Sequence, residues 1–176
     1  MANREALREL QTRLASRLQA ARSEGVSVSW LAVKAGDANY LFPLAQSGEI
    51  FPLTNVQVVP YCRPWFLGVM NLRGGLCGVA DLASFVGDGS ARARSEQSLA
   101  ESSVITFNSA LELNCALMVD DLAGLRKREA FSRISAPPEC SPVYFGNRFT
   151  DLGGAHWQEI NLQSLSQLPE FLSISA

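Results

Sequence analysis

Two blocks of the chain, 80 residues apart, follow the same pattern, and this repetition constrains the fold more than any other feature. Residues 71–74 (NLRG) align with residues 151–154 (DLGG), and residues 81–85 (DLASF) align with residues 161–165 (NLQSL) at the same offset. A constant offset through two matches indicates a duplicated structural unit. Leucine, serine and glycine are common residues, so a chance match is the alternative.

Each block contains the signals of a turn, a strand and a short helix. Gly74 and Gly75 form the first predicted turn, since glycine accepts the backbone angles of tight turns. Asp81 and Asn161 stand where a side-chain oxygen can cap a helix, and a leucine follows each of them. In the second block a glycine occupies the position of Arg73, so the turn itself does not require an arginine. Arg73 is therefore predicted to serve something outside the fold.

After Gly25 the chain consists mostly of short apolar runs rich in valine, isoleucine and aromatic residues, separated by glycine, proline, aspartate and asparagine. This composition and spacing predict strands. The predicted strands occupy residues 26–33, 38–44, 55–60, 66–72, 76–80, 103–107, 111–119 and 156–162. So many short strands favour a mainly β fold of small barrels or a sandwich.

Residues 3–22 are predicted to form an amphipathic helix. Leu7, Leu10, Leu14 and Leu18 recur three and four residues apart among charged and amide side chains, which places them on one helix face. A solvated stripe of four leucines is unfavourable. We expect the stripe to pack on the body of the protein, with packing on a partner as the alternative.

The chain divides into an N-terminal helix at residues 1–25 and a single domain at residues 26–176. Residues 87–102 (GDGSARARSEQSLAES) have almost no large apolar side chain and are predicted to be a polar connection within that domain. A first barrel is expected at about residues 26–86, and a second barrel with the C-terminal segment at about residues 103–176. Exchange of strands between the two barrels is a further option.

Composition and charge exclude several classes of protein. A hydrophobic content of 47% with 18% charged residues is ordinary for a globular chain, and a formal net charge of -2 offers no basic surface for nucleic acid. The charged N-terminus lacks the apolar segment of a secretory signal, and no run approaches the roughly 18 apolar residues of a membrane helix. We expect a cytoplasmic protein that reaches a membrane only through its partners.

No catalytic or metal-binding motif is present in the sequence. The cysteines at positions 62, 77, 115 and 140 form no CxxC pair, and His156 is the single histidine, so neither a metal nor another cofactor is predicted. Asp120 and Asp121 are adjacent and point to opposite faces of a strand, which does not suit a shared metal ion. An enzyme using Cys62 or Cys77 with His156 is the alternative to a binding protein.

Residues 64–87 (PWFLGVMNLRGGLCGVADLASFVG) resemble the signature of CheW-like domains. Residues 28–50 are similar to the first strands of that family, and residues 102–124 resemble the start of its second half. The resemblance covers about residues 26–172. The N-terminal leucine helix and the ending LSQLPEFLSIS are most similar to PilI, the CheW-like adaptor of the chemosensory systems that control type IV pili.

This resemblance implies two intertwined SH3-like barrels of about five strands each, with short helices after the barrel strands and a groove between the barrels. It implies an adaptor and no enzyme. Such an adaptor couples the cytoplasmic tip of a methyl-accepting chemoreceptor to a CheA-type histidine kinase, here in control of twitching motility. An adaptor of a flagellar or other chemosensory system is the alternative, and no kinase-binding residue is predicted.

The resemblance also implies that Arg73, Asn71 and Glu49 bind the receptor. Ser47 and Gly48 precede Glu49 where the family typically has an apolar residue followed by a larger polar one. For Arg73 the alternative is an internal role, in which the guanidinium satisfies backbone carbonyls and ties the turn to a neighbouring strand.

Overall fold

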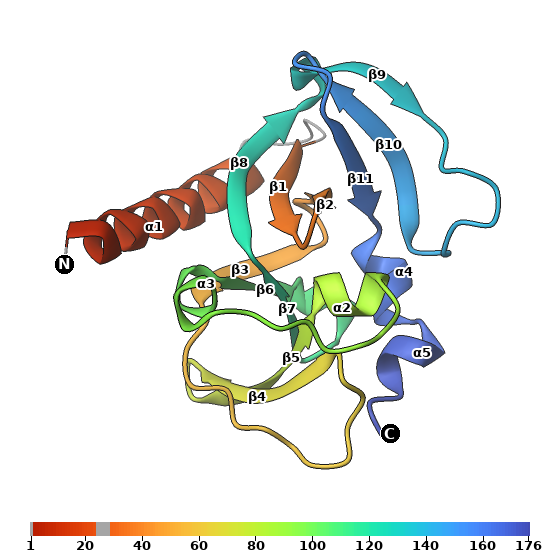
Figure 1. Ribbon diagram of the computed structural model, residues 1–176. Coiled ribbons are helices and arrows are strands. Elements are labelled where there is room, and N and C mark those ends of the chain that lie inside the picture. Colours follow the sequence, from red (N-terminus) through yellow and green to blue (C-terminus); the bar gives the residue numbers. More distant parts are fainter. Residues whose placement is uncertain (1, 24–28) are drawn as a thin grey trace.

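The structure is a computed structural model that describes residues 2–23 and 29–176, and its strands form two sheets (Figure 1). The order in the six-stranded sheet is β8 (Asp121–Lys127), β1 (Ser29–Ala35), β2 (Ala38–Pro43), β11 (His156–Ile160), β10 (Phe145–Asp151) and β9 (Phe131–Ser135). The order in the five-stranded sheet is β3 (Ser47–Pro52), β6 (Ser103–Phe107), β7 (Cys115–Val119), β5 (Gly75–Asp81) and β4 (Phe66–Leu72). The chain is mainly β, as predicted.

The two sheets share one arrangement. The order β3-β6-β7-β5-β4 corresponds to β8-β1-β2-β11-β10, and the parallel pair, β5 with β7 or β11 with β2, falls at the same place in both. In each sheet a hairpin from one half of the chain lies beside strands from the other half. The predicted boundaries at residues 26–86 and 103–176 therefore separate the halves of the chain but not the sheets. Strand β9 is an addition to the six-stranded sheet.

The repeated sequence blocks form equivalent hairpins, each followed by a short helix. Hairpin β4–β5 leads into α2 (Leu82–Val86), and hairpin β10–β11 leads into α4 (Leu162–Ser166). Asn161 caps α4, since its side chain accepts a hydrogen bond from the Ser164 backbone N–H at 3.0 Å. Asp81 stands at the N-cap of α2 but accepts no such bond, so its predicted capping role is wrong. Its carboxylate has a buried cationic partner instead.

The predicted strand at residues 55–60 is also wrong. Only Gln57 forms a bridge there, with Val69 of β4. Gly68 permits this close approach, because its φ is 136° and an added Cβ would lie 2.1 Å from the Gln57 carbonyl oxygen. Strands β3, β8, β9 and β10 were not predicted. Strand β8 illustrates the reason, because Asp121, Arg126 and Lys127 interrupt any apolar alternation.

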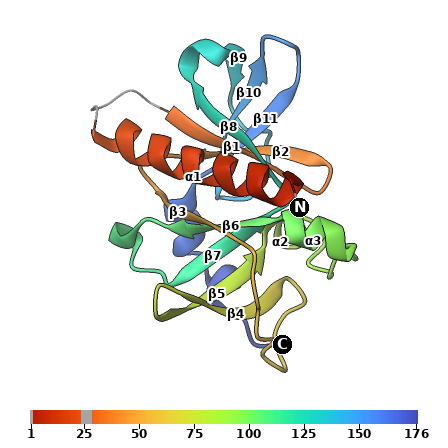
Figure 2. The same cartoon turned by 90° about the vertical axis from the view of Figure 1, so that its left-hand side faces the viewer.

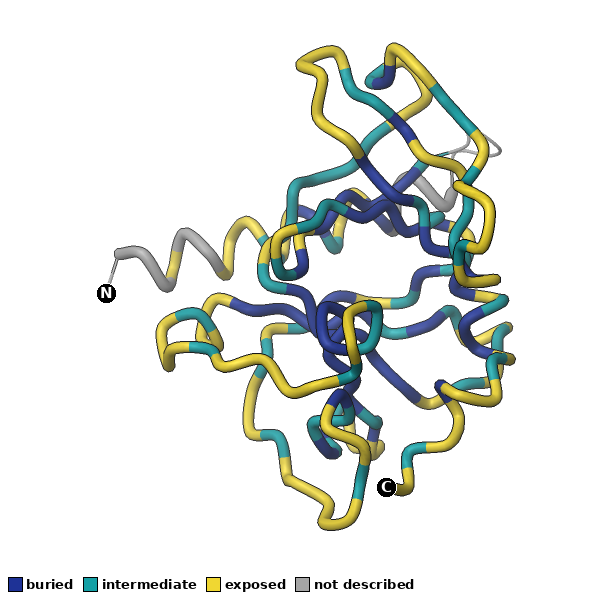
Figure 3. The backbone as a smooth tube through the Cα atoms, turned by 45° about the vertical axis from the view of Figure 1, so that its right-hand side comes forward, coloured by how far each residue is buried: buried dark blue, intermediate teal, exposed yellow. Residues whose placement is uncertain are grey.

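In the part of the chain that the structure describes, buried side chains form three clusters. The largest lies where the faces of the two sheets meet, and it includes Leu31 and Phe42 of one sheet with Ile105 and Leu117 of the other. Each sheet also has a smaller cluster on its opposite face, one containing Trp30, Phe149 and Trp157 and the other Met70, Val79 and Met118. Figure 3 shows the buried backbone concentrated at the centre of the molecule. Three cores suit two curled sheets that pack against each other.

Helix α1 (Ala2–Ser23) packs on the body of the same chain, crossing the junction of the two sheets (Figure 2). It contacts β3 and β8, which are edge strands of their sheets. Leu14 and Leu18 are buried in the central cluster, whereas Leu10 is half exposed. The Gln11 side chain donates to Ser103 Oγ at 2.9 Å. The side chain of Leu7, the remaining member of the predicted stripe, lies outside the described residues.

The polar connection contains a helix that was not predicted, α3 (Glu96–Glu101), which Ser95 caps by accepting from the Ser98 backbone N–H. Short helical turns η1 (Ser109–Leu111) and η2 (Arg128–Ala130) link strands, and α5 (Pro169–Leu172) lies near the C-terminus. Among the described helices, none has the length and apolar character needed to cross a membrane.

Candidate functional site

Residues 49 and 73, which were expected to bind a receptor, meet at the rim of one cavity in the five-stranded sheet. The cavity has a volume of about 400 Å³ and lies between β3, the β4–β5 hairpin, β6 and the loop that precedes β7. Its lining includes the apolar side chains Phe51, Leu72, Phe107 and Leu113 and the polar side chains Glu49, Arg73, Thr106, Glu112 and Asn114. We call this cavity the hairpin groove.

Arg73 forms an ion pair at the rim of the hairpin groove. Its Nη1 lies 2.9 Å from Glu49 Oε1, and its guanidinium carbon lies 5.7 Å from the centre of the Phe51 ring. The two charged side chains remain 72% and 45% exposed, so the pair contributes little to folding. Both partners keep surface with which to contact a ligand.

The backbone at Arg73 is unusual for a residue with a side chain. Its φ is 51° and that of Gly74 is 84°, so both central residues of the turn have positive φ, as in a type I′ hairpin. Glycine, asparagine and aspartate are the residues that normally occupy such positions. An arginine here carries a conformational cost, which agrees with selection for its side chain rather than for the turn.

A bulge in β3 sets the position of Glu49. The register between β3 and β6 shifts between Ser47 and Ile50, and the Glu49 backbone N–H donates to Thr106 Oγ1 at 2.7 Å. An added Cβ on Gly48 would lie 2.1 Å from the same oxygen. At Ser47-Gly48, where the sequence departs from the family pattern, β3 approaches β6 too closely for a side chain at position 48. The bulge at this place fixes the strand that carries Glu49.

Asn71 supports the turn and does not line the groove. Its Oδ1 accepts a hydrogen bond from the Gly74 backbone N–H at 2.9 Å. The side chain of Asn114 donates to the Leu76 carbonyl, which connects the loop before β7 to the hairpin. The sequence did not indicate the roles of Asn114, Thr106 or Phe51, because they come from segments that meet only in the fold.

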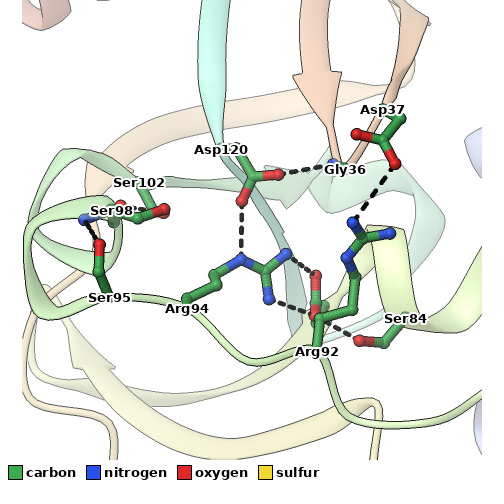
Figure 4. A network of polar contacts seen from close by, with 10 residues as sticks. Gly36, Asp37, Ser84, Arg92, Arg94, Ser95, Ser98, Ser102 and Asp120 are labelled. Carbon is green, nitrogen blue, oxygen red and sulfur yellow. Dashed lines mark hydrogen bonds and ion pairs between the residues drawn. The ribbon is translucent and has the colours of Figure 1, made fainter.

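Asp81 belongs to a buried ionic cluster with Arg94 of the polar connection. Figure 4 labels Arg94, Asp120, Ser84 and Gly36 of this cluster. Arg94 Nη1 and Nη2 donate to the two oxygens of Asp81 at 2.6 and 2.9 Å, and Arg94 Nε donates to Asp120 Oδ1 at 2.8 Å. Asp120 Oδ2 accepts from the Gly36 backbone N–H at 2.6 Å, and Ser84 Oγ donates to Asp81. Burial alone would lower the pKa of Arg94, but the two carboxylates raise it. We call Arg94 and its partners, which are Asp81, Asp120, Ser84 and the backbone of Gly36, the Arg94 cluster.

The predicted cysteine–histidine alternative finds no support in the geometry. His156 Nδ1 lies 3.2 Å from Thr150 Oγ1, and within the described chain no hydrogen bond joins His156 to Cys62 or Cys77. Burial raises the pKa of Cys77, and burial together with the neighbouring Cys77 raises that of Cys115 to about 12. Thiols of this kind are poor nucleophiles. Among the described residues no group of histidine, cysteine, aspartate and glutamate side chains could hold a metal ion.

The hairpin groove combines an apolar base with an exposed ion pair and contains no arrangement suited to covalent chemistry. Such a surface is typical of a protein that binds another protein, with the apolar base receiving side chains and the charges setting their orientation. The fold and the groove thus define a two-sheet β protein with a groove whose lining suits the binding of another protein.

The comparisons with known proteins identify the family. The family model described as CheW-like domain matches residues 29–139, and the chain belongs to this family. Among solved structures, the scaffolding protein TtCheW from Thermoanaerobacter tengcongensis is similar, with a TM-score of 0.59 and 15% sequence identity. The match covers 77% of this chain and 89% of that chain, and at this identity it supports the fold alone. The search of curated proteins found no match.

Proposed function

We propose that this protein is an adaptor that couples a methyl-accepting chemoreceptor to a CheA-type histidine kinase, with the hairpin groove as its receptor-binding surface. Membership of the CheW-like family supports the adaptor role. The observation that carries the choice of surface is the exposed Arg73–Glu49 pair beside Phe51, held by a turn whose backbone disfavours arginine. The receptor tip is helical, and a helix in a groove presents apolar anchors flanked by polar residues.

In this proposal the charged pair and the apolar base have different roles. The apolar base accepts one or two side chains of the receptor helix, which provide most of the binding free energy. Arg73 and Glu49 are both exposed. Each can therefore give up part of its contact with the other and form a hydrogen bond to the receptor helix. Asn71 acts indirectly, by holding the turn that carries Arg73.

The test is reconstitution of the ternary complex. A pull-down with this protein first recovers its partners, and mass spectrometry should identify a histidine kinase and a methyl-accepting receptor. Purified kinase, receptor cytoplasmic fragment and adaptor are then assembled. Arg73→Ala is expected to weaken recovery of the receptor while the kinase stays bound. Arg133→Ala, at an exposed position in the other sheet, is the matched control. Equal receptor recovery by the two variants would reject the groove as the receptor surface.

We further propose that the chemosensory system is the one that controls type IV pili. The resemblance of the N-terminal helix and the C-terminal segment to PilI supports this choice, and α1 and α5 are the helices formed by those segments. Recruitment to receptor arrays at the inner membrane would then occur through the receptor. Deletion of the gene should abolish twitching and leave swimming intact. Loss of swimming with normal twitching would assign the adaptor to a flagellar system.

A further inference from the structure

A second cavity lies on a different part of the molecule, between α2 and the C-terminal helix α5. Its volume is about 490 Å³, within the range of small-molecule sites. The ring of Trp65 stacks on Phe171 of α5 with centroids 5.5 Å apart, and Phe85 of α2 meets Phe171 edge-on at 5.1 Å. Figure 1 shows α5 below α4 and beside the chain's end. Trp65, Phe85 and Tyr144 line the cavity, which we call the aromatic pocket.

Two hydrogen-bond donors of the aromatic pocket have no partner in the described part of the chain. Trp65 and Tyr144 are each only 6% exposed, yet neither the indole N–H nor the phenol hydroxyl forms a hydrogen bond among the described residues. The other two indoles differ, because Trp30 donates to Glu159 at 2.7 Å and Trp157 donates to Asp151 at 3.0 Å. Both donors of the aromatic pocket are therefore available to a group that enters it.

These donors are not sealed inside the protein. Among the described residues, Gln158 Oε1 is the one fully buried polar side-chain atom without a partner. The Trp65 indole and the Tyr144 hydroxyl therefore keep some access to solvent, and the aromatic pocket is the opening that both residues share. Burial, with smaller effects of Tyr40 and Glu170, raises the pKa of Tyr144 to about 12, so its hydroxyl remains a donor at neutral pH.

The charges around the aromatic pocket limit what it can accept. Arg63 supplies one positive charge, whereas Asp88 and Glu170 supply two negative charges. Asp88 is already bonded to the backbone N–H and hydroxyl of Ser90. The lining thus offers two unpartnered donors and aromatic walls with no excess of positive charge. A neutral acceptor suits these groups better than an anion.

We infer that the aromatic pocket is a binding site for an uncharged aromatic ligand with a carbonyl acceptor, in which the ring lies against Phe85 and the exposed edge of Trp65, and the carbonyl oxygen accepts from the Trp65 indole and the Tyr144 hydroxyl. Ring contacts of this kind add to the burial of apolar area. The carbonyl oxygen takes the place of the solvent that both donors can reach and sets the orientation of the ligand. This site does not depend on the receptor-binding role of the hairpin groove.

Nuclear magnetic resonance of the ¹⁵N-labelled protein tests the inference directly, because the chain has three tryptophans and so three indole N–H signals. Benzamide is the probe. Toluene is the matched control that lacks the carbonyl acceptor, and benzoate is the matched control that carries a negative charge. Benzamide should shift the Trp65 signal in a saturable manner and leave the Trp30 and Trp157 signals in place. Toluene and benzoate should bind several-fold more weakly. Equal shifts of all three indoles, or no saturable shift at Trp65, would overturn the site.

Tyr144→Phe keeps the ring and removes only the donor, so it should fold normally. It should weaken benzamide binding by roughly 5- to 10-fold, the usual effect of one hydrogen bond. Tyr61→Phe, at a 90% exposed tyrosine outside the pocket, is the matched control and should bind as the wild type does. Wild-type affinity in Tyr144→Phe would reject the acceptor chemistry.

A second probe distinguishes the source of the ligand. N-acetylphenylalanine methylamide represents a phenylalanine in a partner's chain, and its tighter binding would indicate a protein side chain. Tighter binding of benzamide would indicate a free small molecule.

Discussion

At the scale of one residue, Arg73 combines a backbone conformation that disfavours arginine with an exposed side chain. The turn needs only small residues with positive φ, and the equivalent position in the second block is Gly153. The structure shows one part of the alternative internal role, because the guanidinium ties the turn to strand β3, but among the described residues it bonds no backbone carbonyl. The guanidinium instead pairs with the exposed carboxylate of Glu49.

Removing either member of this pair should change binding far more than stability. Arg73→Ala and Glu49→Ala should each alter the free energy of unfolding by less than about 0.5 kcal/mol, because exposed ion pairs contribute little. Receptor affinity should fall in both variants. If the pair binds the helix as a unit, the double variant loses less than the sum of the single losses. Urea unfolding and receptor titration measure the two quantities. A variant that unfolds easily but binds normally would assign the pair to folding.

Tyr144 should make stability fall at alkaline pH. Its pKa in the folded protein, about 12, lies above the ordinary value of 10.0, chiefly because the ring is buried. The contribution of Tyr144 to the free energy of unfolding is complete below about pH 10, where its hydroxyl is protonated in both the folded and the unfolded protein. It is lost as the pH rises toward 12, because the tyrosine ionises first in the unfolded chain. Urea unfolding between pH 9 and 12 measures how the free energy of unfolding falls with pH. The fall should be shallower in Tyr144→Phe than in the wild type, by up to about 1.4 kcal/mol per pH unit. Parallel curves for wild type and variant would contradict this.

At the scale of elements, the sequence pattern of α1 predicts the helix well and its contacts less completely. Spacing of three and four residues identifies the apolar face, but only the fold determines how much of that face meets the body. Leu14 and Leu18 enter the central cluster, while Leu10 is 50% exposed. Helix α1 also packs on one edge strand of each sheet, β3 and β8, which hinders these two strands from pairing with other chains.

Leucine substitutions in α1 should therefore differ in their effects. Leu14→Ala and Leu18→Ala should each lower the free energy of unfolding by about 2–3 kcal/mol, because each removes buried methyl groups and leaves a cavity. Leu10→Ala, on the same helix, should change it by less than about 0.5 kcal/mol and serves as the control. Thermal unfolding followed by circular dichroism provides the measurement. Equal effects at all three positions would mean that the helix does not dock as described.

At the scale of the whole molecule, the Arg94 cluster joins parts that are distant in the sequence. Asp81 ends a strand of the five-stranded sheet, Asp120 lies between β7 and β8, and Gly36 belongs to the β1–β2 turn of the other sheet. Arg94 comes from the connection that was predicted to be a simple polar linker. The connection is thereby fixed to the junction of the two sheets.

Arg94→Met should destabilise the protein by about 3–5 kcal/mol, because it leaves the buried carboxylate of Asp81 without its cation. Arg92→Met is the matched control, since Arg92 lies two residues away and its side chain is 43% exposed. Its ion pair is long, with 3.7 Å between Arg92 Nη2 and Asp37 Oδ2. That variant should lose less than about 1 kcal/mol. Chemical denaturation compares them. If Arg94→Met is as stable as Arg92→Met, the cluster does not hold the sheets together.

Local patterns in the sequence determined the mainly β class, the N-terminal helix, the duplicated unit of turn, strand and short helix, and the turn that carries Arg73. These features depend on neighbouring residues, through side-chain periodicity, glycine backbone freedom and helix capping. Only the tertiary structure decided that each sheet combines strands from both halves, and that Asp81 binds Arg94 instead of capping a helix. It likewise decided that Glu49 meets Arg73 over Phe51 and that residues 55–60 make a single bridge. Strand pairing and ion pairing join residues far apart in the chain, and the local sequence carries no record of which distant segment will supply the partner.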